Sequence, residues 1–175
     1  MFTNEGKILL IVFCAADACR GDELVNLETD PIEDVGSTLV ITITSIKTKI
    51  SRTFVVTKTK GNINILDLYR KYVALRPSHT SHRRFFTYYK NGKCTTQPVR
   101  KNTMQKIPNI IATYLNLLDP TSYTGHCMWR SSATLLADVG ADITTIKRNG
   151  GWKSTTVAES YLESSIENQT NMYCK

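Results

Sequence analysis

The sequence lacks the patterns that mark disulfide-linked, zinc-bound or membrane-spanning proteins. Its five cysteines are odd in number and include no C-x-x-C pair, so neither a disulfide framework nor a zinc site is indicated. No apolar run is long enough for a transmembrane helix. Internal repeats, low-complexity runs and inter-domain linkers are missing as well. We therefore expect residues 1–175 to form a single domain of a reduced, intracellular protein without a membrane partner.

Acidic residues are too few to balance the basic ones. The chain has 22 lysines and arginines against 15 aspartates and glutamates, a formal net charge of +7 and a pI near 9.2. Such a charge favours a polyanionic partner, with nucleic acid ahead of an anionic membrane surface. A basic surface that is simply solvated is the alternative, so charge ranks partners without identifying one.

One apolar segment near the N-terminus allows two interpretations. Residues 8–16 follow Lys7 and lead into small residues up to Cys19, which resembles a signal peptide with its cleavage region. The acidic Glu5 before the run and the single lysine argue against secretion. We expect a buried helix over residues 8–18 instead.

Hydrophobic periodicity predicts a mainly α fold with a small antiparallel β-sheet, an α+β architecture. Dense β-branched residues in alternation indicate strands, and Asn91-Gly92 indicates a hairpin turn. Helices end at prolines and at Gly140, and Asp142 caps a short one. The expected helices cover residues 8–18, 20–27, 63–75, 104–118, 127–139, 142–147 and a last one from 154 or 155; the expected strands cover 38–46, 52–56 and 85–89; residues 30–37 form a loop, and the polar tail 169–175 is mobile.

Several charged residues suit a phosphate partner. Arg20 and Glu23 are three apart and share a helix face, although their spacing alone favours a simple surface ion pair. Lys47 and Lys49 lie at a hairpin tip, where lysines are usually just solvated. The segment 83–101 interleaves basic and aromatic residues, which suits a phosphate backbone or a strand with solubilising charges. The weaker candidates for DNA contact are Arg83, Arg84, Lys93, Arg100, Arg130, Lys147, Arg148 and Lys153.

Residues 124–161 add the groups that phosphodiester chemistry requires. A tyrosine hydroxyl becomes a nucleophile when a base takes its proton and cations neutralise the group under attack. Arginines must hold the nonbridging oxygens, and a proton donor must serve the leaving oxygen. Composition alone leaves open whether such groups converge. The chain supplies these types in Arg20, Lys47, His126, Arg130, Trp152 and Tyr161.

At these residues the sequence resembles the catalytic domain of tyrosine recombinases, the phage integrase type, and most closely the versions in eukaryotic mobile elements of the Crypton and DIRS kind. Four segments carry the resemblance in order: C-R-G-D-E-L (19–24), I-K-T-K-I-S-R-T-F (46–54), G-H-C-M-W-R-S-S-A-T-L-L-A (125–137) and G-G-W-K-S-T-T-V-A-E-S-Y (150–161). The resemblance implies the fold of the tyrosine recombinase catalytic domain and DNA as the partner. It implies no metal, cofactor or small-molecule substrate.

By position, the resemblance assigns roles to individual residues. Arg20 matches the first catalytic arginine and Glu23 the acidic residue that orients the site. Lys47 matches the hairpin lysine that acts as general acid toward the leaving 5′-oxygen, with Lys49 as the fallback. His126 matches the residue that serves in general acid/base work.

The last motif supplies the nucleophile, and the one before it departs from the family pattern. Trp152 matches the His-or-Trp position that hydrogen-bonds the scissile phosphate, and Tyr161 matches the nucleophile that forms a 3′-phosphotyrosyl bond. The family pattern H-x-x-R places a second catalytic arginine where this chain has Trp129. Arg130 is next in sequence, but one residue turns a side chain about 100° around a helix. We therefore expect impaired cleavage.

The second departure is extent. Family members usually carry a separate N-terminal helical domain that closes around DNA, and we expect this clamp to be absent here. The resemblance also implies a homo-oligomer on DNA and a nuclear location if the source is eukaryotic. Two functions follow as hypotheses: a tyrosine recombinase domain with impaired cleavage, or an inactive DNA-binding or interaction module derived from a mobile element.

Overall fold

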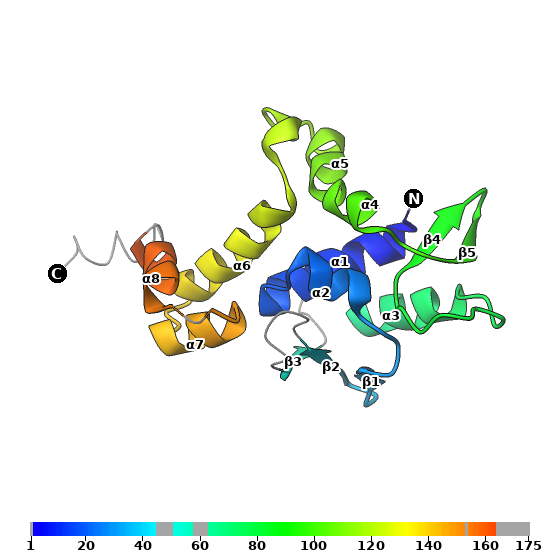
Figure 1. The fold of residues 1–175 in the computed structure, drawn as a ribbon, viewed down its shortest axis with the longest axis horizontal. Helices are drawn as coiled ribbons and strands as arrows, with labels where there is room; N and C mark the ends of the chain where they lie inside the picture. Colours follow the sequence, from blue (N-terminus) through cyan, green and yellow to red (C-terminus); the bar gives the residue numbers. More distant parts are fainter. Residues whose placement is uncertain (1, 45–50, 58–62, 153, 164–175) are drawn as a thin grey trace.

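Helices dominate the structure and lie over a small three-stranded sheet, with a two-stranded hairpin at one end (Figure 1). The computed structural model describes residues 2–44, 51–57, 63–152 and 154–163. The expected α+β architecture with antiparallel strands is confirmed. In chain order the elements are α1 (Asn4–Asp17), α2 (Gly21–Asn26), β1 (Ile32–Asp34), β2 (Thr38–Thr44), β3 (Ser51–Thr57), α3 (Ile65–Ala74), β4 (Thr87–Lys90), β5 (Lys93–Pro98), α4 (Lys101–Gln105), α5 (Ile107–Tyr114), the 3₁₀ turn η1 (Pro120–Ser122), α6 (Gly125–Asp138), α7 (Ile143–Asn149) and α8 (Thr155–Glu163).

The three-stranded sheet has the order β1-β2-β3 and buries one face. Ile41 of β2 lies opposite Phe54 of β3 in an antiparallel register, and alternate residues of both strands are buried. This apolar face packs toward α1 and α3. The expected loop at 30–37 is wrong in part, because Ile32 pairs with Ile41 and forms the edge strand β1. A three-residue strand is too short to show alternation in a sequence.

The expected buried helix near the N-terminus is present as α1. It starts at Asn4, four residues earlier than predicted, because the Thr3 side chain caps it by accepting a hydrogen bond from the Gly6 N–H at 2.9 Å. Leu9 and Phe13 are fully buried in the larger hydrophobic core. Ala18 ends the helix in a left-handed conformation with φ of 40°, so the expected end at residue 18 is one residue too late.

The expected strand at 85–89 starts later, at Thr87. Phe85 and Phe86 turn inward and pack on each other with ring centroids 4.9 Å apart. The Thr87 N–H then donates to the Tyr72 hydroxyl at 3.0 Å. The turn between β4 and β5 has positive φ at both Asn91 (52°) and Gly92 (79°), as a two-residue hairpin of the Asn-Gly type requires.

The expected helix over 104–118 is wrong in extent, because it is two helices. The helix α4 ends at Gln105, and α5 begins at Ile107 with Pro108 in its first turn. Proline has no N–H to donate to the carbonyl four residues earlier, and its ring would clash with that carbonyl. The helix must therefore restart at this point.

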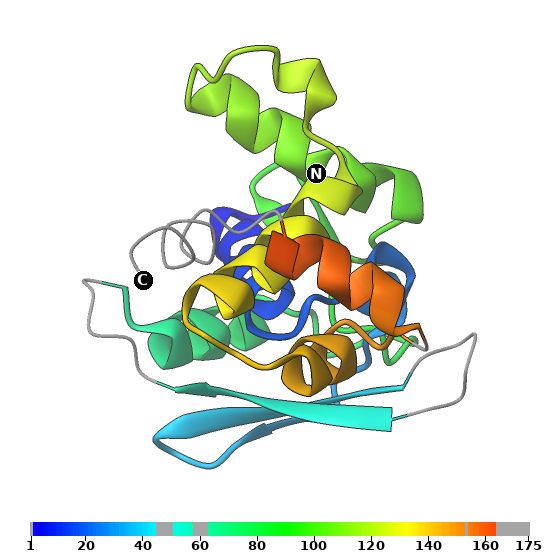
Figure 2. The ribbon, with the colours of Figure 1, turned by 90° about the vertical axis from the view of Figure 1, so that its left-hand side faces the viewer.

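The C-terminal helices form a second, smaller hydrophobic cluster. Ala133 and Ala137 of α6, Ile146 of α7 and Ala158 of α8 surround the buried Trp152. Figure 2 shows α8 lying across α6 and α7. Helix α6 ends at Asp138, close to the end expected just before Gly140. Helix α7 begins at Ile143 with Asp142 as its N-cap, as expected.

Polar contacts join the two clusters at the C-terminal end of α1. The fully buried Ser132 of α6 accepts a hydrogen bond from Ala18 N–H at 3.1 Å and donates one to the Ala15 carbonyl at 2.8 Å. Asn149 of α7 donates to the Ala16 carbonyl at 3.2 Å. The last turn of α1 thus has its backbone groups satisfied by residues from the other half of the chain.

Candidate functional site

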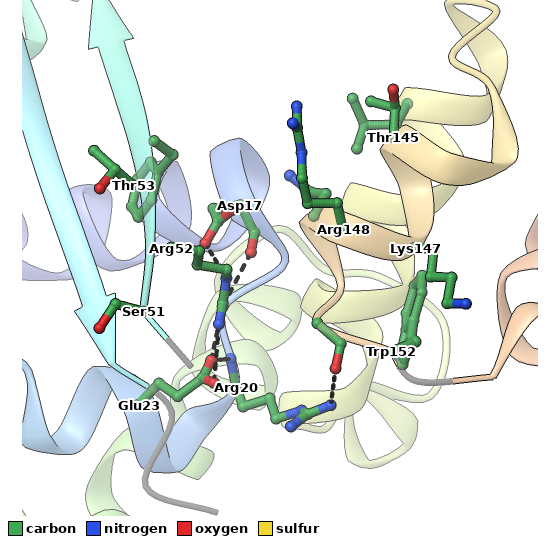
Figure 3. A pocket seen from close by; sticks show the side chains of 14 residues that line it. Asp17, Arg20, Glu23, Ser51, Arg52, Thr53, Thr145, Lys147, Arg148 and Trp152 are labelled. Atoms are coloured by element: carbon green, nitrogen blue, oxygen red, sulfur yellow. Dashed lines mark hydrogen bonds and ion pairs between the residues drawn. The ribbon is translucent and has the colours of Figure 1, made fainter. Parts of the chain in front are cut away.

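Two neighbouring clefts share Arg20 as a wall residue. The larger, about 700 Å³, lies between the end of α1, the start of α2, strand β3 and helix α7 (Figure 3). The smaller, about 540 Å³, lies toward α4 and the start of α6. A group bound at Arg20 can therefore be reached from both sides.

Four residues predicted to be catalytic line these clefts: Arg20 lines both, Glu23 and Trp152 line the larger, and His126 lines the smaller. Trp152 faces the larger cleft, and His126, the exposed second residue of α6, lines the smaller one. Between them, the Arg20 Nη2 donates to the Gly151 carbonyl at 3.3 Å. This contact ties the α1–α2 link to the residue before Trp152.

Glu23 does not form the surface ion pair with Arg20 that the sequence allowed. Its side chain is buried, and Arg20 is the N-cap of α2 rather than a residue within the helix. The Glu23 carboxylate accepts the Arg20 backbone N–H at 2.8 Å. Its charge is matched by another arginine.

That arginine is Arg52 of β3, which the sequence reasoning missed. Its Nη1 and Nη2 donate to the two carboxylate oxygens of Glu23 at 3.0 and 2.8 Å. Its Nε donates to Asp17 Oδ2 at 2.5 Å. Figure 3 shows this guanidinium lying between Asp17 and Glu23. One buried cation is therefore shared by two buried carboxylates.

The two carboxylates respond differently to this environment. Burial raises the pKa of Asp17 to about 6, against the opposing effect of the Arg52 charge. Burial also disfavours ionised Glu23, but hydrogen bonds from Arg52 and from the Arg20 backbone outweigh it and lower the pKa of Glu23. For Arg52, burial acts against the charge, yet the two carboxylates hold its pKa above the ordinary value. Glu23 and Arg52 are thus charged at neutral pH, and Asp17 titrates just below it.

A tight glycine turn sets the position of Trp152. A methyl group at Gly150 would lie 2.6 Å from three atoms of the Trp152 indole, which is closer than carbon atoms approach. Gly151 has φ of 60°, a left-handed conformation that disfavours a side chain. The Trp152 backbone N–H donates to the Lys147 carbonyl at 3.0 Å. The turn therefore holds the indole close to Gly150, at the C-terminal end of α7.

The weaker candidates for DNA contact divide into two groups. Lys147 and Arg148 of α7 line the larger cleft, with Arg148 exposed. Arg83 lies elsewhere and is ion-paired with Glu28 and Asp30. The others that lie outside both clefts are Arg84, before β4, Lys93 at the start of β5, Arg100 at the N-cap of α4, and Arg130, which lines a separate groove on α6.

Five positions of the prediction have side chains outside the described part of the structure. Lys47, its fallback Lys49 and Lys153 fall in undescribed segments. Trp129 lies in α6, three residues after His126, and Tyr161 lies in α8, so their backbones are placed. Their roles stay predictions.

The smaller cleft adds residues that the sequence analysis did not select. Lys101 and Gln105 of α4 line it beside His126. The Lys101 ammonium pairs with Asp22 of α2 at 2.7 Å. This pair joins α4 to α2 at the cleft rim.

The described residues offer neither a metal-binding cluster nor a membrane-spanning helix. Within residues 2–44, 51–57, 63–152 and 154–163, no group of three or more His, Cys, Asp or Glu side chains is placed to hold a metal ion. Each helix in those same ranges is too short or too polar to cross a membrane.

Comparison with known proteins gives one family and one fold. The profile described as "Phage integrase family" matches residues 5–168. The XerH site-specific recombinase bound to palindromic difH substrate has a TM-score of 0.76 at 16% identity, covering 99% of this chain and 47% of XerH. The XerA recombinase gives 0.72 at 17% identity, covering 99% of this chain and 64% of XerA. The Tn1549 transposon integrase in complex with circular intermediate DNA gives 0.64 at 14% identity, covering 95% of this chain and 58% of that one.

The chain spans between about half and two thirds of the length of these recombinase structures. No curated protein sequence matches it. At such low identities the structural matches speak for the fold alone.

Proposed function

The chain belongs to the phage integrase family, and from that premise we propose that it binds DNA and cuts and rejoins strands at specific sites through a 3′-phosphotyrosyl intermediate. The observation that carries this proposal is the position of Arg20, which lines one cleft with Trp152 and the neighbouring cleft with His126. These are three of the residues that the family resemblance selects.

The proposed reaction is a transfer between two oxygens at one phosphorus. The Tyr161 hydroxyl gives its proton to His126 and attacks the phosphorus, the bond to the 5′-oxygen breaks, and the Lys47 ammonium gives that oxygen a proton. Arg20 neutralises the nonbridging oxygens, and Trp152 donates a hydrogen bond to one of them. A 5′-hydroxyl of a second strand reverses the step, so no external energy source is consumed.

Trp129 impairs this reaction in our proposal. Three residues apart on α6, positions 126 and 129 share a helix face, so residue 129 belongs with His126. An indole offers one neutral N–H where a guanidinium offers a charged fork. Loss of one preorganised donor typically lowers the rate by about 10²- to 10³-fold. Arg130 lines another groove of α6, which argues against it as the replacement.

A nicked suicide substrate tests the proposal. With wild-type protein we expect little covalent protein–DNA adduct, and Trp129→Arg should raise the yield. Trp129→Arg combined with Tyr161→Phe should return it to zero. An efficient wild-type reaction would contradict impairment, and no adduct with the restored arginine would contradict the catalytic role.

The second candidate function is a non-enzymatic DNA-binding or interaction module, and Trp129 favours it. In that case the protein binds duplex DNA in a salt-dependent way, Tyr161→Phe leaves the affinity unchanged, and Trp129→Arg yields no adduct. Absence of DNA binding at low salt would rule this candidate out.

The setting of this function is proposed on the same resemblance. From the likeness of the four sequence segments we propose a mobile-element recombinase of the Crypton and DIRS kind, acting inside the cell and in the nucleus of a eukaryote. Structures of similar fold include a lambda integrase dimer bound to a COC′ core site (TM-score 0.61, 14% identity). A homo-oligomer on DNA is accordingly the expected assembly.

A further inference from the structure

The link between α1 and α2 is held at both ends by one side chain. Arg52 bonds Asp17 at the last position of α1 and Glu23 within α2. Arg20 lies between these two anchor points. Building on the function proposed above, we infer that Arg52 is a positioning residue that fixes Arg20 for the DNA phosphate without touching the phosphate itself.

The hydrogen bonds of Arg52 commit it to carboxylates rather than to a phosphate. Each of its three guanidinium nitrogens donates to an acidic side chain, through Nε to Asp17 and through Nη1 and Nη2 to Glu23. Only 13% of its side chain is exposed. To grip a phosphate with two of these nitrogens, Arg52 would have to release at least one buried carboxylate, which would leave that carboxylate uncompensated.

Arg20, by contrast, is held through its backbone and one edge of its guanidinium. Its N–H donates to Glu23 Oε2, the same oxygen that Arg52 Nη2 holds at 2.8 Å. Its Nη2 donates to the Gly151 carbonyl, and its side chain lines both clefts. The order of support therefore runs from Arg52 through Glu23 to the Arg20 backbone.

The geometry requires arginine at position 52. A lysine ammonium is a point charge and cannot present the planar fork that spans Asp17 and both oxygens of Glu23. Strand β3, which carries Arg52, also follows the hairpin segment that contains Lys47. Through Glu23, Arg52 thus links strand β3, which follows Lys47, to the backbone of Arg20.

Arg52→Lys tests this inference with two independent measurements. The first is amide hydrogen exchange. The Arg20 N–H should exchange about tenfold faster, because its acceptor Glu23 is no longer held in place by Arg52. Amides of α6 should keep their wild-type rates. The second is affinity for a fluorescein-labelled DNA duplex, which should fall about tenfold.

Arg70→Lys is the matched control. Arg70 also grips a carboxylate with two bonds, to Asp34 at 2.7 and 3.1 Å, but it lies on α3 and is half exposed. Its replacement should change neither Arg20 exchange nor DNA affinity. If Arg52→Lys does not fold, Glu23→Asp serves instead, since its shorter side chain cannot reach Arg52 and the Arg20 N–H together.

The outcomes separate this inference from the proposed function. Unchanged Arg20 exchange in Arg52→Lys would overturn the inference, and so would a uniform rise at all amides, which would indicate a purely structural role. If wild-type protein does not bind DNA, the proposed function fails, while the exchange measurement still decides whether Arg52 positions Arg20.

Discussion

Arg52 holds Glu23 with a two-point grip, Nη1 to Oε1 at 3.0 Å and Nη2 to Oε2 at 2.8 Å, inside the wall of the larger cleft. A buried carboxylate paired in this way stays ionised, because protonating it would leave the arginine charge without its partner. The second acid on the same arginine, Asp17, has no such two-point grip. This asymmetry makes the cluster sensitive to pH.

The stability contributions of the two acids have opposite signs. Asp17 binds a proton more tightly when folded, so its contribution is complete below pH 3.8 and is lost as the pH rises through about 6. Glu23 has a lowered pKa, so its contribution is present above pH 4.5 and is lost as the pH falls. Between pH 4.5 and 7 the change from this pair comes from Asp17.

Asp17→Asn should remove that change. The amide oxygen still accepts from Arg52 Nε, but no buried negative charge forms as the pH rises. Relative to wild type, the variant should gain on the order of 2 kcal/mol of unfolding free energy between pH 4.5 and 7.5. Urea denaturation at both pH values measures this, and taking the difference between proteins cancels the histidines. Parallel pH profiles would contradict the assigned pKa of Asp17.

Ser132→Ala should destabilise the fold by about 1–3 kcal/mol, since it leaves the Ala18 N–H and the Ala15 carbonyl buried without their partner. Thr134→Ala is the control, because Thr134 bonds the Arg130 carbonyl within the same helix and should cost less than half a kcal/mol, about the effect of a surface substitution. Urea unfolding of both variants decides; equal losses would show that the Ser132 bridge adds nothing.

Gly150→Ala should displace the Trp152 indole, because the added methyl would lie 2.6 Å from it. Overpacking of this kind typically costs about 1–3 kcal/mol, and DNA affinity should fall with the loss of the indole from the cleft. At Gly125 a methyl would meet no atom within 4 Å, so Gly125→Ala should leave the free energy of unfolding unchanged or raise it. A stable Gly150→Ala protein with wild-type indole chemical shifts would show that the turn can adapt.

Lys147 and Arg148 should carry part of the salt dependence of DNA binding. Neither makes an ion pair with an acidic side chain of the described residues, so both are available to phosphates. Replacing both by alanine should reduce the slope of log affinity against log salt by about 2. Lys71→Ala, on the distant α3, should leave the slope unchanged. Titrations of DNA with protein at salt concentrations from about 50 to 200 mM distinguish these outcomes.

The fold was largely predictable, because its elements carry strong local signals. Strands β2 and β3 alternate over seven residues each, and α1 is nearly continuously apolar. The errors fell where local signals are weak or conflict. The edge strand β1 is three residues long, and Pro108 splits a segment whose apolar spacing reads as one helix.

The site was predictable only through the family resemblance, and Arg52 was missed although its position gives a signal. Arg52 is in phase with the buried Phe54 and Val56 along β3. Asp17 is likewise three and four residues beyond the buried Cys14 and Phe13 of α1. Opposite charges at buried positions of a strand and a helix are expected to pair with each other. The sequence alone does not show which strand packs against which helix. That pairing depends on tertiary packing.

The contacts that finish α1 also bear on the order in which the chain can fold. Ala15, Ala16 and Ala18 are synthesised well before their partners Ser132 and Asn149, which follow 114 to 133 positions later. Until a ribosome has released α7, the end of α1 has water in place of these side chains. Contacts so distant in sequence form slowly. The cleft at Arg20 therefore cannot assemble in a nascent chain until α6 and α7 have emerged.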